Sequence, residues 1–223
     1  MNEINNDKIV NFINEIYIDK NVSRDLEDLR AWGEANQIPI IHREVGEFIK
    51  TILLLQKPKK ILEIGTAIAF SSIFFASICQ DAKVTTIEIN EEIIPTALSN
   101  IKKFGFEDRI EVINGDALDV IPGLDEGYDF VFIDAAKGQY IKFFELLEEK
   151  LADRAVIISD NILFRGMVGD NELVKRRKIT IVKRLREYLN MLVEKKHYTS
   201  SILQIGDGVA LTIREAKWNK SNY

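Results

Sequence analysis

Five acidic residues stand where five successive predicted strands end, and no other positions in the sequence are better placed to do chemistry. They are Glu63, Glu88, Asp116, Asp134 and Asp160. In open α/β sheets, ligands bind beyond the carboxyl ends of the strands. A single acidic residue at such a point is equally well explained as the cap of the following helix. Five of them on five consecutive units indicate a ligand cleft.

Two of these positions could hold a metal ion. Asp134 ends the fourth predicted strand, and Asp160 with Asn161 ends the fifth. If these strands are neighbours about 4.8 Å apart, their terminal side chains can converge on one ion. Two carboxylates and an amide oxygen suit Mg²⁺ or Ca²⁺, whereas the sequence offers only two histidines and one cysteine to a softer metal. The alternative is that Asp160 and Asn161 cap a loop.

The stretch from Ile61 to Ser71 predicts a cofactor turn. An apolar strand reaches Gly65, and small residues then lead into an apolar helix, as in the first unit of nucleotide-binding sheets. A dinucleotide fingerprint would need glycine at position 67, which is alanine. Glu88 follows Gly65 by 23 residues and can accept hydrogen bonds from ribose hydroxyls. Because S-adenosyl-L-methionine (SAM) and NAD both carry that ribose, Glu88 alone does not discriminate between them.

An alternation of strands and helices from Lys60 onwards predicts the sheet that positions these residues. Near-continuous apolar runs, such as 130–133 and 155–158, are typical of parallel strands buried on both faces. The predicted strands cover 60–64, 83–89, 110–114, 128–133 and 155–159, and the predicted helices between them cover 71–80, 91–104, 117–121 and 138–151. Such units imply right-handed crossovers and a doubly wound sheet.

The segments on either side of this alternation follow other patterns. The expected helices are 6–20, 24–36 and 43–56 before it and 175–195 after it, and residues 161–174 are expected to form a loop. Two further strands at 198–206 and 208–215, joined at Asp207-Gly208, predict a hairpin. We expect one domain over residues 1–223, with a helical extension at 1–57 and an α/β core at 60–215.

Composition and charge restrict the setting and the partners. No apolar run approaches the roughly 20 residues that a membrane-spanning helix needs, and Met1 to Lys8 contains no signal-peptide core. With Cys79 as the only cysteine, no intramolecular disulfide can form. We therefore expect a cytoplasmic protein without a membrane partner. The net charge is −5, yet Lys175 to Arg186 holds seven basic residues and no acidic one, which is a local feature that needs a reason.

The motifs together resemble a known enzyme family. Glu63-Ile64-Gly65-Thr66 resembles the methyltransferase motif Glu-x-Gly-Thr. The run Asp134-Ala135-Ala136-Lys137, followed by Asp160-Asn161, resembles the cation-dependent O-methyltransferases, the group that contains the catechol and caffeoyl-coenzyme A enzymes. The resemblance extends from about Gln37 to Arg214. It implies the class I SAM methyltransferase fold, with a seven-stranded sheet, and a homodimer.

The resemblance also implies roles for individual residues. Asp134 and Lys137 would be catalytic, and Asp134, Asp160 and Asn161 would bind Mg²⁺ or another hard divalent cation. The implied SAM-binding residues are Ile41, Glu63, Gly65, Thr66, Phe70, Ser71, Glu88, Gly115, Asp116, Ala117 and Asp134. Two positions depart from the family pattern, since Ala69 stands where glycine is common and Phe70 where tyrosine is common. We expect these departures to tune SAM binding rather than abolish it.

Two classes of substrate are candidates. Metal chelation favours vicinal oxygens, which catechol-like or hydroxycinnamoyl compounds and 5-hydroxyuridine all provide. The loop at 161–174, the basic stretch and Gly206-Asp207-Gly208 resemble the bacterial tRNA 5-hydroxyuridine methyltransferases, which convert the wobble nucleoside to 5-methoxyuridine. That resemblance implies contacts to the tRNA anticodon loop from Arg165, Lys175, Arg176, Arg177 and Lys178. The alternative explanation of the basic stretch is a solvated helix face.

Overall fold

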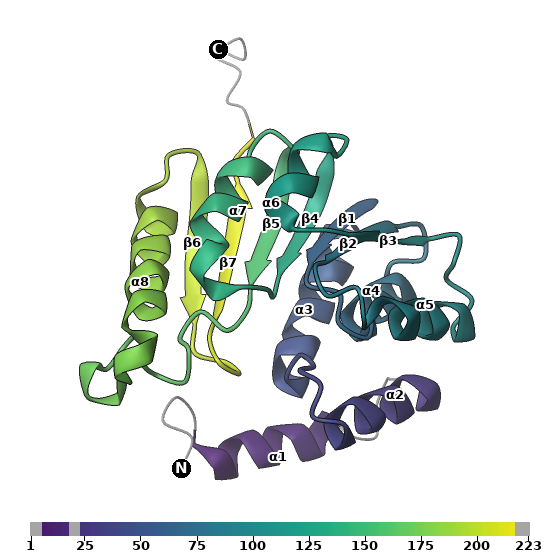
Figure 1. The fold of residues 1–223 in the computed structure, drawn as a ribbon, viewed down its shortest axis with the longest axis horizontal. Coiled ribbons are helices and arrows are strands. Elements are labelled where there is room, and N and C mark those ends of the chain that lie inside the picture. The colour runs from purple at the N-terminus through teal and green to yellow at the C-terminus, as the bar shows by residue number, and fades with distance from the viewer. Residues whose placement is uncertain (1–5, 18–22, 217–223) are drawn as a thin grey trace.

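The apolar runs that predict buried strands form the centre of one seven-stranded sheet (Figure 1). The structure is a computed structural model, and it describes residues 6–17 and 23–216. The strands are β1 (Lys60–Ile64), β2 (Lys83–Glu88), β3 (Ile110–Asn114), β4 (Tyr128–Ile133), β5 (Leu151–Ser159), β6 (Tyr198–Leu203) and β7 (Val209–Arg214). Their order is β3-β2-β1-β4-β5-β7-β6, with β1 to β5 parallel and β7 antiparallel to both its neighbours. The predicted doubly wound sheet with a C-terminal hairpin is therefore confirmed.

Helices cover both faces of this sheet. They are α1 (Asp7–Tyr17), α2 (Arg24–Ala35), α3 (Arg43–Gln56), α4 (Phe70–Ile78), α5 (Ile94–Lys103), α6 (Ala117–Val120), α7 (Tyr140–Leu147) and α8 (Ile179–Glu194). Short 3₁₀ turns occupy Ile121–Gly123, Lys137–Gln139, Asn171–Leu173 and Arg176–Lys178. No helix among residues 6–17 and 23–216 combines the length and the apolar character that a membrane crossing requires.

Side chains that alternate along β4 build a separate core on each face. Phe130 and Phe132 point to the face covered by α2 to α5, where the ring of Phe75 packs edge-on against them at centroid distances of 5.8 and 5.4 Å. Val131 and Ile133 point to the other face, among buried side chains of α7 and α8. The sheet is thus rigidly held from both sides, and its strand ends are fixed in position.

Helices α1 and α2 lie below the carboxyl end of the sheet at the bottom of Figure 1, and α3 runs from there along one face of the sheet. The Ser23 side chain caps α2 by accepting a hydrogen bond from Leu26 N at 3.3 Å. Both oxygens of the Glu27 carboxylate accept hydrogen bonds from Arg43 at 2.7 Å, which ties α2 to α3. The predicted helical extension is present over the described residues, while positions 18–20 of its first helix lie outside them.

Several boundaries differ from the sequence-based prediction, and three elements show it most clearly. Strand β5 begins at Leu151 rather than at 155, because Leu151 pairs with Tyr128 ahead of a register shift that the pattern does not reveal. The predicted helix at 138–151 is a 3₁₀ turn followed by the shorter α7, and the predicted helix at 175–195 begins as a 3₁₀ turn, with α8 starting at Ile179.

The turn of the C-terminal hairpin is longer than the two residues expected. Five residues, 204–208, separate β6 from β7. This turn packs closely on its surroundings, since a Cβ on Gly208 would lie 2.3 Å from Leu163 and a Cβ on Gly206 would lie 2.6 Å from Val45. The turn therefore follows the shape of α3 and of the segment after β5, rather than the geometry of an isolated hairpin.

Candidate active site

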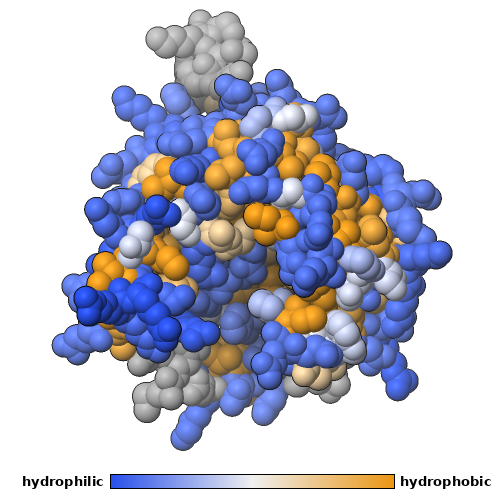
Figure 2. Space-filling model, viewed as in Figure 1, coloured by the Kyte–Doolittle hydropathy of each residue, from blue (hydrophilic) through white to orange (hydrophobic). Residues whose placement is uncertain are grey.

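A cleft of about 660 Å³ opens at the carboxyl ends of the strands, beside the adjacent strands β1 and β4. The strand order reverses direction at this pair, which is where open α/β sheets bind ligands. Figure 2 shows the molecular surface hollowed near the centre of the view. The predicted SAM-binding residues that line the cleft are Ile41, Gly65, Thr66, Phe70, Ser71, Glu88, Gly115, Asp116, Ala117 and Asp134.

The turn after β1 requires glycine because β4 approaches it closely. Gly65 has a φ of +105°, and a Cβ there would lie 2.2 Å from the backbone oxygen of Asp134. Its N–H donates to Ile87 O at 3.0 Å, which anchors the turn to β2 as well. Gly65 therefore joins the predicted cofactor turn directly to the strand end that carries Asp134.

The carboxylate of Glu88 organises the same turn. Its Oε2 accepts hydrogen bonds from Thr66 N at 3.1 Å and Ala67 N at 2.9 Å, and its Oε1 accepts one from Asn90 N at 2.9 Å. Because each carboxylate oxygen has two lone pairs, Oε2 is fully used and Oε1 keeps one lone pair for another donor. The half-buried Glu88 side chain lines the cleft, so its position is compatible with the expected ribose contact while its backbone contacts hold the turn in shape.

Two non-glycine residues of this turn adopt left-handed backbone conformations. Ala67 has a φ of 46° and Ala69, which precedes α4, has a φ of 63°. Glycine adopts this region freely, which explains in physical terms why glycine would suit position 69. The buried Ala69 methyl group is accommodated in the core, and Phe70 contributes an apolar ring to the cleft wall without a hydroxyl.

Glu63 was predicted to bind the cofactor, but its side chain does not line the cleft. Strand alternation points its side chain towards α4, where it is completely buried. Its Oε2 accepts hydrogen bonds from Ser72 Oγ and, at 2.7 Å, from Thr86 Oγ1, while Oε1 has no partner. Burial raises the pKa of Glu63 to about 7. Glu63 therefore supports the turn from below.

Stability should depend on pH through Glu63. An unfolded glutamate releases its proton near pH 4.5, whereas the folded one releases it near 7. Between these values the folded protein binds more protons, so stability falls as pH rises, by about 3 kcal/mol in total. Glu63→Gln should remove this loss of stability. The urea midpoint of the variant, relative to that of the wild type, should therefore be higher at about pH 8 than at about pH 5.

The exposed Glu111→Gln on β3 is the control for this measurement, because it also removes one carboxylate. Its urea midpoint should follow the wild-type pH profile. Parallel profiles for wild type and Glu63→Gln would show instead that the buried carboxyl keeps the same charge throughout.

The three predicted metal ligands come together at the ends of β4 and β5. Asn161 Nδ2 donates to Asp134 Oδ1 at 2.8 Å, and Asp160 Oδ1 accepts from Asn161 N at 2.6 Å. The Tyr140 hydroxyl donates to Asp160 O at 2.9 Å and fixes this strand end. Asp160 is only 1% exposed, and burial together with the charge of Asp134 raises the pKa of its carboxyl group well above the usual range.

The chemistry of these donors fits a hard divalent cation. Asp160 Oδ2 is buried and has no hydrogen-bond partner, which is costly for a carboxylate unless a cation compensates. A half-turn of the Asn161 amide would present its oxygen beside the two carboxylates, giving the oxygen donors that Mg²⁺ prefers. Among the described residues no three His, Cys, Asp or Glu side chains form a cluster, and the predicted set accordingly contains only two carboxylates.

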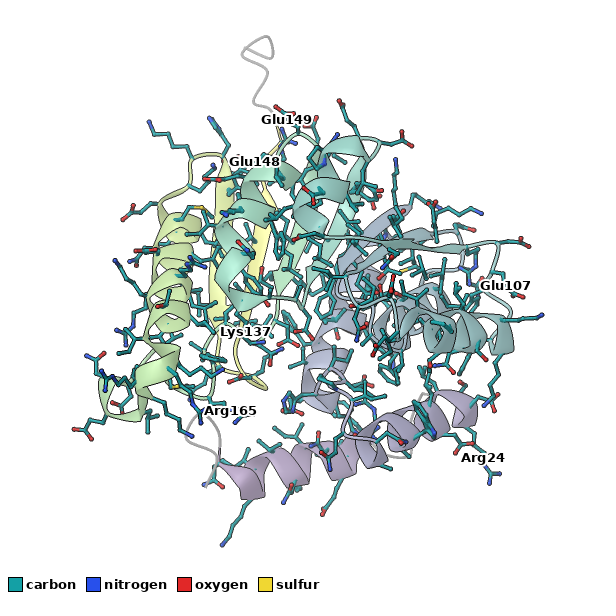
Figure 3. All side chains as sticks on the ribbon, in the orientation of Figure 1. Arg24, Glu107, Lys137, Glu148, Glu149 and Arg165 are labelled. Carbon is teal, nitrogen blue, oxygen red and sulfur yellow. The ribbon has the colours of Figure 1, made fainter. Side chains whose placement is uncertain are left out.

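Lys137 and an acidic residue that was not among the predicted site residues also line the cleft. Lys137 begins the 3₁₀ turn after β4, and Figure 3 shows it with Arg165 towards the lower end of the sheet, far from Glu148 and Glu149. Asp207, from the hairpin turn, lines the same cleft and accepts a hydrogen bond from Arg165 N. Burial raises the pKa of Asp207, whereas the Arg165 N–H and the charge of Lys137 oppose the rise.

The chain is similar to known O-methyltransferases. The family model described as O-methyltransferase matches residues 17–215. Caffeoyl-CoA O-methyltransferase of Stellaria longipes is 30% identical over 208 residues, which cover 86% of this chain and 84% of that protein. The chain belongs to this O-methyltransferase family. Catechol O-methyltransferase of Niastella koreensis is 29% identical over 75% of this chain and 79% of its own length.

Solved structures of relatives agree with this O-methyltransferase assignment. A candidate caffeoyl-CoA O-methyltransferase from Staphylococcus aureus has 38% identity and a TM-score of 0.87, covering 93% of this chain and 100% of that one. The O-methyltransferase of Bacillus cereus, solved with S-adenosylhomocysteine (SAH), has 25% identity and a TM-score of 0.80, covering 93% and 97%. The chain is accordingly a SAM-dependent O-methyltransferase.

The basic stretch of this O-methyltransferase divides into surface and structural residues. Lys175, Arg176 and Arg177 are exposed, and Lys178 Nζ lies 5.6 Å from the ring centroid of Phe164, which lines the cleft. Arg186, by contrast, donates to Val168 O at 2.9 Å and holds the loop after β5. Lys178 therefore lies next to a residue of the cleft wall, and Lys175, Arg176 and Arg177 precede it on the surface.

Several other lining residues carry no motif. They are Pro39, Ile40, Ile68, Ile87, Ile89, Gln139, Phe143 and Phe164. Most belong to apolar segments whose composition resembles core, so the sequence offers no signal to separate them. The sequence analysis used Asp207 only as part of the Gly206-Asp207-Gly208 turn and gave it no role in the site, although an acidic residue at the tip of a predicted hairpin beside β5 could have been considered.

Proposed function

We propose that this O-methyltransferase methylates the 5-hydroxyl of 5-hydroxyuridine at the wobble position of tRNA, using SAM and Mg²⁺ or another hard divalent cation. The observation that carries the proposal is the pairing of Lys178 with the cleft-lining Phe164, at 5.6 Å. It connects a surface suited to phosphates with the pocket suited to the reacting base. The proposed cellular setting is the cytoplasm, where tRNA is available.

The proposed roles of the cleft residues divide along the sheet. When bound, SAM would supply the methyl group, whose bond to sulfur would break as its bond to the substrate oxygen forms, leaving SAH. The backbone of Gly65 and Thr66 would lie against its methionine part, and Glu88 would accept hydrogen bonds from its ribose hydroxyls. Asp116 and Ala117, which line the cleft, would contact the adenine, and Phe70 and Ile41 would provide an apolar wall. These residues bind and orient, which is the main contribution an enzyme makes to such a displacement.

The substrate side of the cleft is proposed to act through charge. Asp134, Asp160 and Asn161 would hold the divalent cation. A cation in that position lowers the pKa of a neighbouring substrate hydroxyl and favours substrates with two vicinal oxygens. 5-Hydroxyuracil offers such a pair through its 5-hydroxyl and 4-carbonyl groups, and an anticodon loop presents its bases unpaired and splayed.

Lys137 is proposed to take the proton that the substrate hydroxyl loses. Lys137→Met should lower kcat about a hundredfold, the lower range of general-base contributions, while leaving the SAH dissociation constant unchanged. Lys142→Met, on the exposed face of α7, should behave as wild type. Single-turnover methyl transfer and SAH titration would separate the two quantities. Full turnover by Lys137→Met at every pH would mean that Lys137 does not act as a base.

A small-molecule substrate is the second candidate. Relatives at 29–30% identity are named for caffeoyl-CoA and for catechol. Such substrates would use the same pair of vicinal oxygens and the same proposed roles for Asp134 and Lys137. A catechol-like substrate, which carries no phosphate, would not require the basic residues at 175–178, and this feature distinguishes it from tRNA.

Nucleoside mass spectrometry tests the proposal. tRNA lacking the final methylation is incubated with the protein, SAM and Mg²⁺, and catechol and caffeoyl-CoA reactions run beside it. Loss of 5-hydroxyuridine with equal gain of 5-methoxyuridine is the expected result. Methylation of catechol or caffeoyl-CoA without change in the tRNA nucleosides would favour the second candidate.

We also propose that the protein forms a homodimer through α1. Ile9, Phe12 and Ile16 share one helix face and are 58%, 62% and 45% exposed, an apolar stripe that a second copy could bury. Light scattering should give a mass near twice 25.6 kDa. Phe12→Glu should give monomers, whereas Asn11→Glu, also exposed on α1, should remain dimeric. A wild-type mass of one chain would contradict the proposal.

A further inference from the structure

A buried arginine of the N-terminal extension contacts two residues of the cleft wall. Arg30, on α2, is 8% exposed. Its Nη1 donates to Ile41 O at 2.8 Å, and its guanidinium carbon lies 4.5 Å from the ring centroid of Phe70. Both Ile41 and Phe70 line the cleft. One side chain from outside the α/β core thus touches the wall at two points.

The surroundings of Arg30 offer little compensation for a buried positive charge, so fold stability alone does not explain this arginine. Its Nε is buried without a hydrogen-bond partner. The carboxylate paired with it, on Glu34, lies 3.9 Å away, and that side chain is 63% exposed. A buried guanidinium normally needs closer compensation than this. Its hydrogen bond to Ile41 O and its stacking contact with the Phe70 ring are both made to the cleft wall. An apolar side chain of similar length at position 30 would be buried there with a smaller desolvation penalty.

Helix α2 meets the wall at a second place. Ile38 N donates to Gly33 O at 2.9 Å, and a Cβ on Gly33 would lie 2.2 Å from Ile40 Cδ1. The segment 38–41, which contributes Pro39, Ile40 and Ile41 to the cleft, has no regular secondary structure. Its shape is therefore set by α2, with Gly33 at one end and Arg30 at the other.

We propose that Arg30 is a positioning residue for the cofactor. It holds Ile41 and the Phe70 ring in the arrangement that SAM meets, so that the N-terminal extension completes the cofactor side of the cleft. The inference rests on the proposed function insofar as SAM is the ligand of this wall. A cation over the face of Phe70 and a hydrogen bond to Ile41 O act on two separate chain segments, which couples them to each other.

Three variants distinguish positioning from general stability. Arg30→Met keeps the length of the side chain and removes both contacts, and Arg30→Lys keeps a cation without the planar fork. Arg43→Met is the matched control, because it removes the two 2.7 Å hydrogen bonds to Glu27 at the same helix pair and keeps the side chain of Arg30 that contacts Ile41 and Phe70. All three are measured as the full chain.

Two readouts are taken for each variant. Titration calorimetry with SAH should show binding weakened about tenfold in Arg30→Met, equivalent to about 1.4 kcal/mol, with Arg30→Lys between it and the wild type and Arg43→Met close to the wild type. Hydrogen–deuterium exchange of the cofactor-free protein should be faster at 38–42 in Arg30→Met only. A urea series on the same variants measures their stability separately, and a lower midpoint in Arg43→Met should leave both readouts unchanged.

Two outcomes would overturn the positioning role. One is wild-type SAH affinity and wild-type exchange in Arg30→Met. The other is equal weakening of SAH binding in Arg43→Met, which would make the effect one of stability alone. If the wild type itself fails to bind SAH, the proposed cofactor is wrong, and the exchange measurement still decides whether Arg30 orders the wall.

Discussion

Asp160→Asn is expected to lower the rate of methyl transfer at least about a hundredfold, equivalent to about 3 kcal/mol of transition-state stabilisation. The carboxylate is 1% exposed, and its Oδ2 is buried without a partner. Asparagine has nearly the same shape, so the fold should survive the change. What the variant loses is one of the two negative charges that a divalent cation would meet, at Asp134 and Asp160.

Metal-dependent thermal stability checks this expectation without relying on turnover. Saturating Mg²⁺ or Mn²⁺ at about a hundred times its dissociation constant should stabilise the wild type by about 2.7 kcal/mol, or roughly 5–10 °C for a chain of this size. The shift should vanish in Asp160→Asn. Asp153→Asn is the control, because Asp153 lies on the same strand at its exposed opposite end. A full metal-induced shift in Asp160→Asn would exclude Asp160 as a ligand.

The sequence correctly predicts those cleft residues that lie at the ends of strands. Parallel strands bring their carboxyl ends to one edge, so strand patterns alone are enough to place Glu88, Asp134 and Asn161 together. Gly65 is recognisable from its place between strand and helix, and the fold adds the physical reason for it, which is the approach of Asp134 O. Local pattern is sufficient for these residues because each lies within one or two positions of a strand end.

The residues that the sequence analysis misplaced or missed depend on side-chain direction and on distant packing. Glu63 shares the motif with Gly65, yet the alternation of β1 turns it under α4 and away from the cleft. Asp207 reaches the cleft only because the hairpin turn packs on the segment after β5. Arg30 reaches it from a helix that precedes the sheet by a whole element. No spacing rule within one segment carries such information.

The extended hairpin turn shows how these long-range contacts shape the site. Leu163 N donates to Asp207 O and Ile162 N to Gly208 O, at 2.9 and 3.0 Å. The turn therefore holds the backbone that follows Asn161, and with it the entrance on the side of Arg165. The cofactor side is held by α2 and the substrate side by this turn, so both walls depend on elements outside the five parallel strands.

Neutralising the basic residues at 175–178 is expected to separate the two candidate substrates by a large factor. With Lys175, Arg176, Arg177 and Lys178 all changed to glutamine, kcat/KM for tRNA should fall on the order of a hundredfold, because each residue would lose a phosphate contact. The slope of log kcat/KM against log salt should become shallower by about 3, at roughly 0.7 for each contact to a single strand. Methylation of catechol, where present, should be unchanged.

The comparison is decided by a control with the same change in net charge. Lys59, Lys83, Lys102 and Lys103 are exposed and belong to the chain around β1, β2 and the end of α5, at the amino-terminal edge of the sheet. Glutamine at these four positions should leave the tRNA kinetics and their salt dependence near wild type, since only charges near the cleft mouth meet the bound anticodon loop. Equal losses in both quadruple variants would indicate non-specific attraction by overall charge. No loss in the variant at 175–178 would remove the principal support for a tRNA substrate and leave the small-molecule reaction as the function of this cleft.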